Sequence, residues 1–137
     1  MEGCIFCAIA AGRAPAEILC QEEGALAFLD AHPAAPGHAL VIPRRHFVTL
    51  WEMDEESAAA VMRLLVQVGR ALRQALQPDG LTVLQNNGRA AGQEVLHAHF
   101  HLIPRRYGDG LRLGRGPLAR PAEPLPEVAR RIREALA

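Results

Sequence analysis

The chain has 137 residues and no formal net charge, and half of its residues are hydrophobic. A chain of this length can bury a sizeable core, so we expect a single domain over residues 1–137. The balanced charge argues against nucleic acid as a partner. All 15 basic residues are arginine, which excludes a Schiff-base lysine and the lysine of a phosphate loop.

The N-terminal sequence and the cysteines indicate the compartment. No apolar run approaches the roughly 20 residues of a membrane-spanning helix, and MEGCIFC lacks the basic and apolar segments of a secretion signal. We therefore expect a cytoplasmic protein with no membrane partner. The three cysteines (Cys4, Cys7 and Cys20) are an odd number in a chain large enough to fold without crosslinks, which favours reduced thiols.

The first part of the chain predicts a short helix and a meander of three strands. Residues 4–11 form the helix, which Gly12 ends. The strands are EILCQ (17–21), ALAFL (25–29) and HALVIP (38–43), separated by EEG and by the turn-rich DAHPAAPG.

The longest predicted helix lies between Asp54, a suitable N-cap, and Gln77, because apolar residues recur there at helical spacing. Two strands follow, LTVLQNN (81–87) and VLHAHFHLIP (95–104), joined by GRAAGQE. The segment GDGLRLGRGPLARPAEPLP then predicts an irregular surface stretch, and an amphipathic helix runs from Pro126 to Leu136. The fold class is α+β with a mainly antiparallel sheet.

All six histidines fall in two short windows, which hold His32, His38 and His46 and then His97, His99 and His101. On a strand, alternate side chains share a face, so the second group points one way while Ala98, Phe100 and Leu102 point into the core. Successive histidines lie about 6.6 Å apart along a strand, so one ion cannot easily bind all three. The spacing suits a row of donors along an extended anion, such as the phosphates of a nucleotide.

These motifs carry a specific resemblance. His97-Ala98-His99-Phe100-His101-Leu102, preceded by Gly92-Gln93 and earlier by DAHPAAPGHALVIPRRH, resembles the histidine-triad (HIT) family of nucleotide hydrolases and transferases. The resemblance covers about residues 4–106 and leaves an irregular segment and a helix over about 107–137. It implies a five-stranded antiparallel sheet, a homodimer whose two sheets join into one, and a purine nucleotide as substrate.

The resemblance also implies a covalent mechanism. His99 is the implied nucleophile, which attacks the α-phosphorus of an adenosine phosphoramidate or a dinucleoside polyphosphate and forms a nucleotidyl-histidine that water hydrolyses. The backbone carbonyl of His97 is implied to hold the ring of His99 in one tautomer. His101 and His38 contact the phosphate and help to protonate the leaving group, and Gln93 lies near the bridging atom.

Further positions match the nucleotide-binding residues of the family. They are Ile5, Phe6, Ile9 and Phe28 around the base, Asp30 at the ribose, and Asn86, Gly92 and Gln93 near the phosphate. Asp30 can also be read as a turn residue and Phe28 as a core residue. Two departures weaken assignment to the phosphoramidase branch: Glu94 stands where that branch has a serine, and the C-terminal segment lacks its tryptophan.

The two N-terminal cysteines suggest a metal. Cys4-x-x-Cys7 alone is equally readable as a redox pair or as two buried small residues. The sequence is, however, similar to bacterial HIT members that bind structural zinc, and it offers Cys4, Cys7, His46 and His97 for a closed tetrahedral site. His97 would then be a structural ligand whose carbonyl orients His99.

Two other functions remain as alternatives. One is a nucleotide-binding or scaffold module whose turnover is incidental. The other is a zinc hydrolase that activates water at a metal held by the triad, which both the strand geometry and the complete Cys2His2 set oppose.

Overall fold

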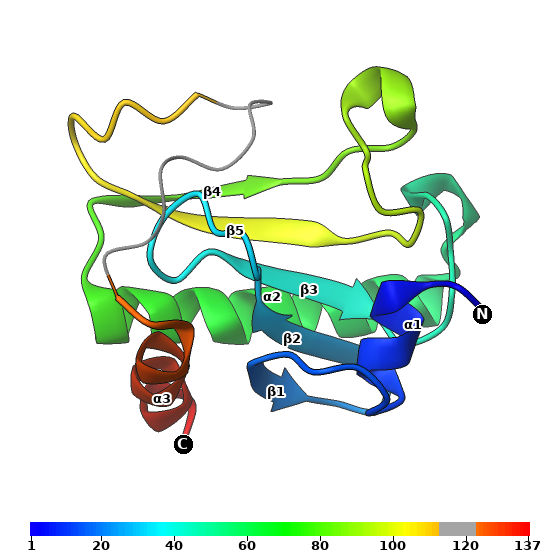
Figure 1. Cartoon of the computed structure of the whole chain (residues 1–137), viewed down its shortest axis with the longest axis horizontal. Helices are drawn as coiled ribbons and strands as arrows, with labels where there is room; N and C mark the ends of the chain where they lie inside the picture. The colour runs from blue at the N-terminus through cyan, green and yellow to red at the C-terminus, as the bar shows by residue number, and fades with distance from the viewer. Residues whose placement is uncertain (113–122) are drawn as a thin grey trace.

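The fold is a five-stranded antiparallel sheet with helices on both faces (Figure 1). The computed structural model describes residues 1–112 and 123–137. The described elements are α1 (Ile5–Ala10), β1 (Ile18–Gln21), β2 (Ala25–Leu29), β3 (Ala39–Pro43), α2 (Glu55–Leu76), β4 (Gly80–Leu84), β5 (Phe100–Arg105) and α3 (Leu125–Leu136), with two short 3-10 turns at Leu50–Glu52 and Arg89–Ala91. The strand order is β1-β2-β3-β5-β4. The predicted α+β class and sheet are confirmed.

The bounds of α2 follow from its end groups. Asp54 is the N-cap, and its carboxylate accepts a hydrogen bond from the N–H of Ser57 at 2.7 Å. At the other end Gln77 adopts the left-handed conformation that ends many helices. Arg106 donates to the unpaired carbonyls of Leu76 and Gln77 at 2.7 and 2.8 Å. Both predicted ends of this helix are confirmed.

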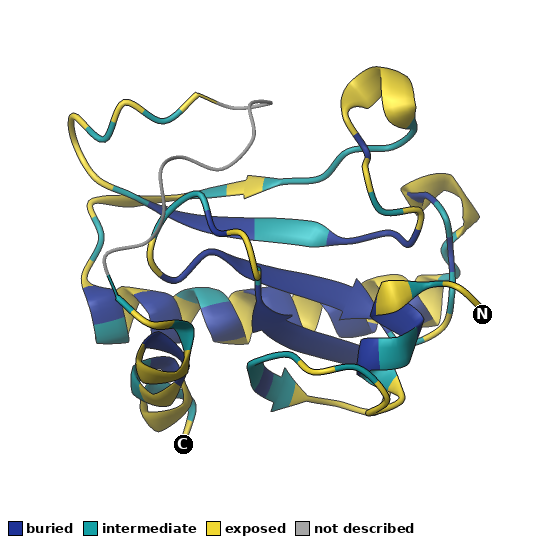
Figure 2. Cartoon of the chain, viewed as in Figure 1, coloured by how far each residue is buried: buried dark blue, intermediate teal, exposed yellow. Residues whose placement is uncertain are grey.

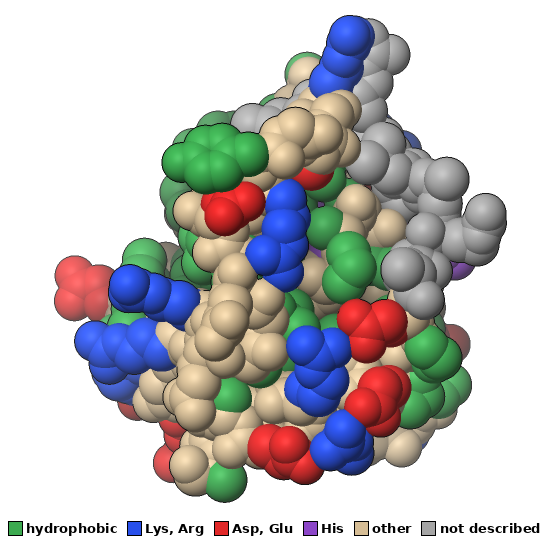
Figure 3. Space-filling view, turned by 90° about the vertical axis from the view of Figure 1, so that its left-hand side faces the viewer, with side chains coloured by type: hydrophobic (Ala, Val, Ile, Leu, Met, Phe, Trp, Pro, Cys, Tyr) green, Lys and Arg blue, Asp and Glu red, His purple; other side chains and the backbone are tan. Residues whose placement is uncertain are grey.

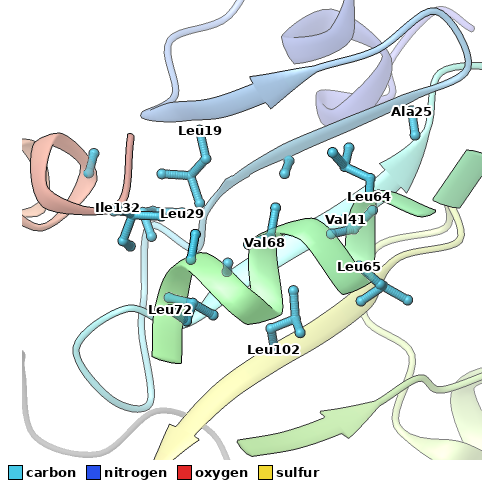
Figure 4. Packing of buried hydrophobic residues seen from close by; sticks show 14 of the residues in the cluster. Leu19, Ala25, Leu29, Val41, Leu64, Leu65, Val68, Leu72, Leu102 and Ile132 are labelled. Atoms are coloured by element: carbon cyan, nitrogen blue, oxygen red, sulfur yellow. The ribbon is translucent and has the colours of Figure 1, made fainter. Parts of the chain in front are cut away.

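The main hydrophobic core lies between the sheet and α2, and Figure 4 shows its side chains from close by. Val41 and Leu102 project from the sheet toward Leu64, Val68 and other buried residues of α2. Ile132 extends this core to α3, so the C-terminal helix packs on the same cluster. Truncating Leu64, Leu102 or Ile132 to alanine is expected to cost about 2–5 kcal/mol.

The opposite face of the sheet carries a second apolar cluster under α1. It contains Phe6 and Ile9 of α1 and Leu26, Phe28, Leu40 and Ile42 of the sheet. These strand residues alternate with those of the main core, and β2 and β3 are buried along their whole length (Figure 2). Strand β4, in contrast, is largely exposed at the edge of the sheet.

Two predicted strands are shorter than expected. β4 ends at Leu84, whereas the sequence pattern predicted a strand to residue 87. β5 begins at Phe100, whereas the sequence pattern predicted a strand from residue 95. The N–H of Ala98 donates to the carbonyl of Phe47 at 2.7 Å, which draws this part of the chain away from β3 and toward the loop after it. Pairing with β3 starts only at Phe100, opposite Val41. Of the three triad histidines, therefore, only His101 lies within the strand.

The surface is mixed in charge. Figure 3 shows arginine and carboxylate side chains interspersed at the end of the molecule that carries α3. On α3 itself, Arg130 pairs with Glu127 and Glu134. Within residues 1–112 and 123–137, no helix is both long and apolar enough to cross a bilayer. Residues 113–122 of the predicted irregular segment lie outside the described part of the chain.

Candidate functional site

The candidate site lies on the α1 face of the sheet, where β2, β3 and β5 meet. His101 pairs in register with Leu40, a member of the apolar cluster under α1, so both side chains project to that face. Asp30 directly follows β2 and His38 directly precedes β3, and the N–H of Asp30 donates to the carbonyl of His38 at 3.0 Å. Gly37, with a φ of +88°, precedes His38, and a Cβ there would lie 2.4 Å from Leu76.

The ring of His99 is held in one orientation. Its Nδ1 lies 2.7 Å from the backbone carbonyl oxygen of His97, which can only accept, so Nδ1 carries the hydrogen. The Nε2 atom of the neutral ring then keeps its lone pair. Phe6 contacts the ring edge to face, with centroids 5.1 Å apart, and the side chain is 8% exposed. His99 thus presents a fixed, partly accessible nitrogen nucleophile.

His38 and His101 form a directed chain of hydrogen bonds. The N–H of Ala34 donates to Nδ1 of His38 at 2.9 Å, so Nε2 of the neutral His38 ring carries its hydrogen. That Nε2 lies 2.9 Å from Nδ1 of His101, to which it donates. The hydrogen of the neutral His101 ring is therefore on Nε2. The ring centroids of His99 and His101 are 5.0 Å apart, so a donor stands beside the nucleophile.

Burial keeps these rings neutral. Desolvation, together with repulsion from His99, lowers the pKa of His38 and of His101 to about 4. The pKa of His99 is also lowered by desolvation, although the His97 carbonyl and the carboxylates of Asp30 and Glu94 oppose that effect. At pH 7 all three imidazoles are in the neutral form that nucleophilic attack and directed donation require.

Asp30, His38 and His101 bring three potential metal-binding atoms within 4.8 Å of one another. The hydrogen bonds argue against an ion there. Because Nδ1 of His38 accepts from a backbone N–H, its Nε2 carries the ring hydrogen and has no lone pair to offer a metal. Nε2 lies 3.5 Å from the carboxylate of Asp30, which can accept only a weak, long contact from it. We interpret this cluster as a proton-donating chain.

Cys4, Cys7, His46 and His97 converge beside the histidine row, with their potential ligand atoms within 4.8 Å of one another. The sulfur of Cys7 lies 3.3 Å from Nδ1 of His46 and 3.5 Å from Nδ1 of His97, and the sulfur of Cys4 lies 3.4 Å from Nδ1 of His97. Zinc–sulfur and zinc–nitrogen bonds in a tetrahedron imply sulfur–nitrogen separations of about 3.5 Å. The donor types and spacing fit a tetrahedral metal ion.

Local structure places these donors. Cys4 is the N-cap of α1, and its sulfur accepts from the N–H of Cys7 at 3.3 Å, so the Cys-x-x-Cys spacing turns both thiols to one side. Nε2 of His97 donates to the carbonyl of Pro43 at 2.9 Å, which leaves the lone pair on Nδ1, the atom facing the thiols. Desolvation lowers the pKa of His97 to about 4 and raises that of Cys4 above its usual range.

The predicted nucleotide-binding residues are only partly assembled. Ile5 is 51% exposed on α1, whereas Phe6 and Ile9 are buried beneath that helix. Phe28 is 2% exposed and meets Phe6 edge to face with centroids 5.4 Å apart, so it belongs to the core. Asp30 accepts from the N–H of His32 at 2.9 Å, which makes it a turn residue that also borders the histidines.

Gln93 is fully engaged with the backbone. Its amide oxygen accepts from the N–H of Gly88 at 2.7 Å, and its nitrogen donates to the carbonyls of Val48 and Val95 at 2.6 and 3.0 Å. The side chain is 3% exposed. Gln93 therefore fastens the loop before the triad, and donation from its amide nitrogen to a substrate would require one of these bonds to break.

Gly92 and Asn86 lie next to each other on the same loop. A Cβ at Gly92 would lie 3.5 Å from Nδ2 of Asn86, and the φ of Gly92 is +95°, a conformation that favours glycine. The glycine thus allows the amide of Asn86 to lie close against the loop backbone.

Comparison with known proteins identifies the family of the chain. Residues 11–108 match the model of the HIT domain family. The chain belongs to the HIT family. HIT proteins are nucleotide-binding hydrolases and transferases, and the five-stranded sheet with one long helix matches the fold of solved HIT structures.

Relatives span bacteria, archaea and eukaryotes. An uncharacterized HIT-like protein of Mycobacterium tuberculosis is 40% identical over 134 residues, covering 98% of this chain and 93% of that protein. The adenosine 5'-monophosphoramidase of Schizosaccharomyces pombe is 44% identical over 111 residues, covering 79% of this chain and 80% of the enzyme. A zinc-bound histidine triad family protein from Mycobacterium smegmatis superposes with a TM-score of 0.87 at 38% identity, covering 98% and 93% of the two chains.

Sequence reasoning missed the backbone groups that orient the HIT histidines. The N–H of Ala34 and the carbonyl of Pro43 determine which nitrogen of His38 and of His97 carries the hydrogen. Neither residue has a functional side chain, so no residue-type signal points to it. The turn-rich run DAHPAAPGH does mark the loop that places Ala34.

Proposed function

We propose that the protein hydrolyses a purine nucleotide conjugate at the α-phosphate through a nucleotidyl intermediate on His99. The observation that carries this proposal is the 2.7 Å hydrogen bond from Nδ1 of His99 to the His97 carbonyl, which leaves Nε2 as a neutral nucleophile. The similarity to a phosphoramidase supports the same class of reaction.

The two steps use the hydrogen-bond chain described above. In the first, the Nε2 lone pair of His99 forms a bond to phosphorus, the bond to the leaving group breaks, and the departing atom takes a proton from solvent while Nε2–H of His101 donates a hydrogen bond to it. His38 positions His101 for this contact by holding its tautomer. In the second, water attacks phosphorus, the nitrogen–phosphorus bond breaks and restores the Nε2 lone pair of His99, and the proton of water passes to solvent.

We assign the remaining residues by what their contacts leave free. Ile5 and the adjoining edge of Phe6 form the apolar surface for the base, and Phe28 supports Phe6 from behind. Asp30 accepts from the ribose hydroxyls. The Ile9 side chain, already buried, stiffens α1 rather than touching substrate.

On the phosphate side, Asn86 donates to a phosphate oxygen. Gly92 has no side chain, which leaves space for the amide of Asn86. Gln93 is a positioning residue for the loop, because both hydrogens of its amide nitrogen already donate to backbone carbonyls.

We further propose that Cys4, Cys7, His46 and His97 hold a structural zinc ion. The spacing of their donor atoms and the zinc-bound relative support it. Zinc would supply a closed tetrahedral crosslink and would take no part in the chemistry. Reduced thiols of this kind suit the cytoplasm, where we place the protein.

A homodimer is the assembly that the exposed edge favours. On the far edge of the sheet, Arg133 of α3 donates to the carbonyl of Ile18 in β1 at 2.7 Å, which blocks that edge. The β4 edge carries the exposed Leu81 and Val83, beside Met62 and Val66 on α2. We propose that a second copy pairs along β4 and covers these four side chains.

Pre-steady-state kinetics test the covalent mechanism. With an adenosine phosphoramidate or a diadenosine polyphosphate, we expect a burst of leaving group equal to the enzyme concentration, followed by slower release of AMP whenever hydrolysis limits turnover. Excess nucleoside acceptor should accelerate the second phase. If His99→Ala kept full activity with both substrates, the mechanism would be contradicted.

A further inference from the structure

We propose that Cys4 and Cys7 are a reversible oxidation site, at which a peroxide converts the two thiolates of the zinc site into a disulfide and the metal is released. The inference rests on the zinc site proposed above and goes beyond it, because it gives the same two sulfurs a second chemistry. The Cys-x-x-Cys spacing then serves both as a metal-binding pair and as a redox pair.

The two sulfurs are placed to form a disulfide with little movement of the backbone. Cys4 is the N-cap of α1, and its sulfur accepts a hydrogen bond from the N–H of Cys7 at 3.3 Å. Both sulfurs belong to the cluster whose potential ligand atoms lie within 4.8 Å of one another. Residues three apart in a helical turn have Cα atoms about 5 Å apart, which is within the range of about 4.4–6.8 Å that a disulfide spans.

The two cysteines differ in access to solvent, and this sets the order of reaction. Cys4 is partly exposed, whereas Cys7 is buried. A small oxidant therefore reaches Cys4 first, and Cys7 is the neighbouring thiol that resolves the oxidised sulfur. The third cysteine cannot compete. Cys20 packs against the core between the sheet and α2, while Cys4 packs against the apolar cluster under α1, so the sheet lies between them.

The oxidation needs a peroxide and two protons from solvent. The Cys4 thiolate attacks one oxygen of hydrogen peroxide, the oxygen–oxygen bond breaks, and a sulfenic acid and a hydroxide form. The Cys7 thiolate then attacks the Cys4 sulfur, the sulfur–oxygen bond breaks, and a second hydroxide leaves as the disulfide forms. The two hydroxides become water. The two sulfurs together lose two electrons, which the peroxide gains, and metal ligation already requires both sulfurs as thiolates.

Oxidation would remove half of the donors of the zinc site. Thiolates bind metals and disulfide sulfurs do not replace them, so His46 and His97 alone would remain, too few for a closed tetrahedral site. The four donors connect α1 to the loop after β3 and to the triad segment. The disulfide, in contrast, closes only residues 4–7 within α1. A crosslink between distant segments is replaced by a local one.

The histidine row would respond to this loss. Phe6 of α1 contacts the rings of His97 and His99 edge to face, with centroids 6.0 and 5.1 Å apart. After oxidation the His97 ring keeps its hydrogen bond to the carbonyl of Pro43 but no longer has the metal on Nδ1. Both the aromatic wall beside His99 and the residue that orients it are then less well fixed, so we expect kcat to fall about tenfold or more.

Peroxide titration of the zinc-loaded wild type tests the site. Zinc release is followed with a chromogenic chelator, and the protein is then alkylated, digested and analysed by mass spectrometry. We expect about one zinc ion to be released for each disulfide formed. The peptide that carries Cys4 and Cys7 should escape alkylation and lose two hydrogens, while Cys20 stays alkylated. Dithiothreitol and added zinc should restore both the thiols and the metal.

Hydrogen exchange gives a readout that does not depend on turnover. The amides of α1 should exchange faster in the oxidised protein, and those of α3, which packs on the main core, should not change. Cys20→Ser is the matched control and should respond to peroxide as the wild type does. Cys7→Ser lacks the resolving thiol, so its Cys4 should proceed to a sulfinic acid that dithiothreitol does not reduce.

The outcomes separate this inference from the functions beneath it. The oxidation site is wrong if peroxide leaves zinc bound, if the disulfide forms without zinc release, if it includes Cys20, or if Cys4 of the wild type is oxidised irreversibly. A wild type that binds no zinc would remove both the zinc site and this inference. If zinc and thiols respond as expected but no nucleotide conjugate is hydrolysed, the oxidation site stands and the hydrolase function falls.

Discussion

The carbonyl oxygen of His97 accepts a hydrogen bond from Nδ1 of His99 at 2.7 Å, and the imidazole of the same His97 faces the thiols of Cys4 and Cys7. One residue therefore joins the candidate metal site to the candidate nucleophile, through its side chain on one side and its backbone on the other. Anything that moves the His97 ring should also disturb the orientation of His99.

Removing a thiol should show this coupling. We expect wild-type protein to contain about one zinc ion per chain and Cys7→Ser to bind zinc at least about tenfold more weakly, with a lower melting temperature, because a closed site loses one of four ligands. Its kcat should also fall, since His97 loses the metal that fixes it. Elemental analysis, calorimetry and steady-state kinetics measure the zinc content, the melting temperature and kcat.

The control for that experiment is Cys20→Ser. Cys20 lies on β1, apart from the four clustered donors, and its replacement should leave the zinc content unchanged. Equal zinc content and equal stability in the wild type and Cys7→Ser would contradict the assignment.

The chain from His38 to His101 should behave as one unit. Because His38 fixes the tautomer of His101 through a 2.9 Å hydrogen bond, we expect His38→Gln and His101→Gln each to lower kcat by about 10²-fold. The double variant should be about as slow as the worse single variant. Losses that multiply in the double variant would show that the two histidines act independently.

The neutral histidines should make stability fall in mild acid. In the unfolded chain His38 and His101 take up protons near pH 6.5, but in the folded protein the pKa of each is lowered to about 4. Between these values the unfolded state binds more protons, so the free energy of unfolding decreases as the pH falls from about 6.5 to 4. The loss is at most about 3 kcal/mol for each histidine.

Urea denaturation at several pH values measures this loss, with zinc content checked at each pH. His101→Gln should show a shallower decrease than the wild type, because it lacks one of the buried histidines whose pKa is lowered. A stability that stays constant from pH 7 to pH 4.5, or an unchanged slope in the variant, would be inconsistent with buried neutral rings.

The exposed β4 edge predicts the assembly. Val83→Arg places a charge on that edge and should convert a dimer into a monomer in sedimentation experiments. Ala11→Arg adds the same charge at the exposed end of α1 and should leave the assembly unchanged. A monomeric wild type, or a Val83→Arg variant that remains dimeric, would show that β4 is not the interface.

Much of the fold could be predicted because its determinants are local. The ends of α2 follow from the cap at Asp54 and the break after Gln77, and the meander follows from short apolar runs between turns. The start of β5 could not be predicted. Whether residues 95–99 join the ladder depends on a hydrogen bond from Ala98 to Phe47, about 50 residues away, which no local pattern contains.

The candidate site shows the same division. The residue types that bear its chemistry were visible as histidines at alternate positions and a Cys-x-x-Cys pair. The hydrogen bonds from Gln93 to the backbone and the burial of Phe28 could not be seen in the sequence, because both depend on tertiary contacts. Residue identity predicted which groups are present, and the structure shows which of them are free to act.

The most direct measurement is a search for the nucleotidyl adduct on His99. The wild type is mixed with an adenosine phosphoramidate, quenched within the first turnover under denaturing alkaline conditions, and digested for mass spectrometry. We predict that the peptide carrying His99 gains the mass of AMP less one water, and that His99→Ala gains none and loses about 10³-fold or more in kcat/KM. An unmodified His99 in an enzyme that turns over, or full activity in His99→Ala, would contradict the covalent mechanism.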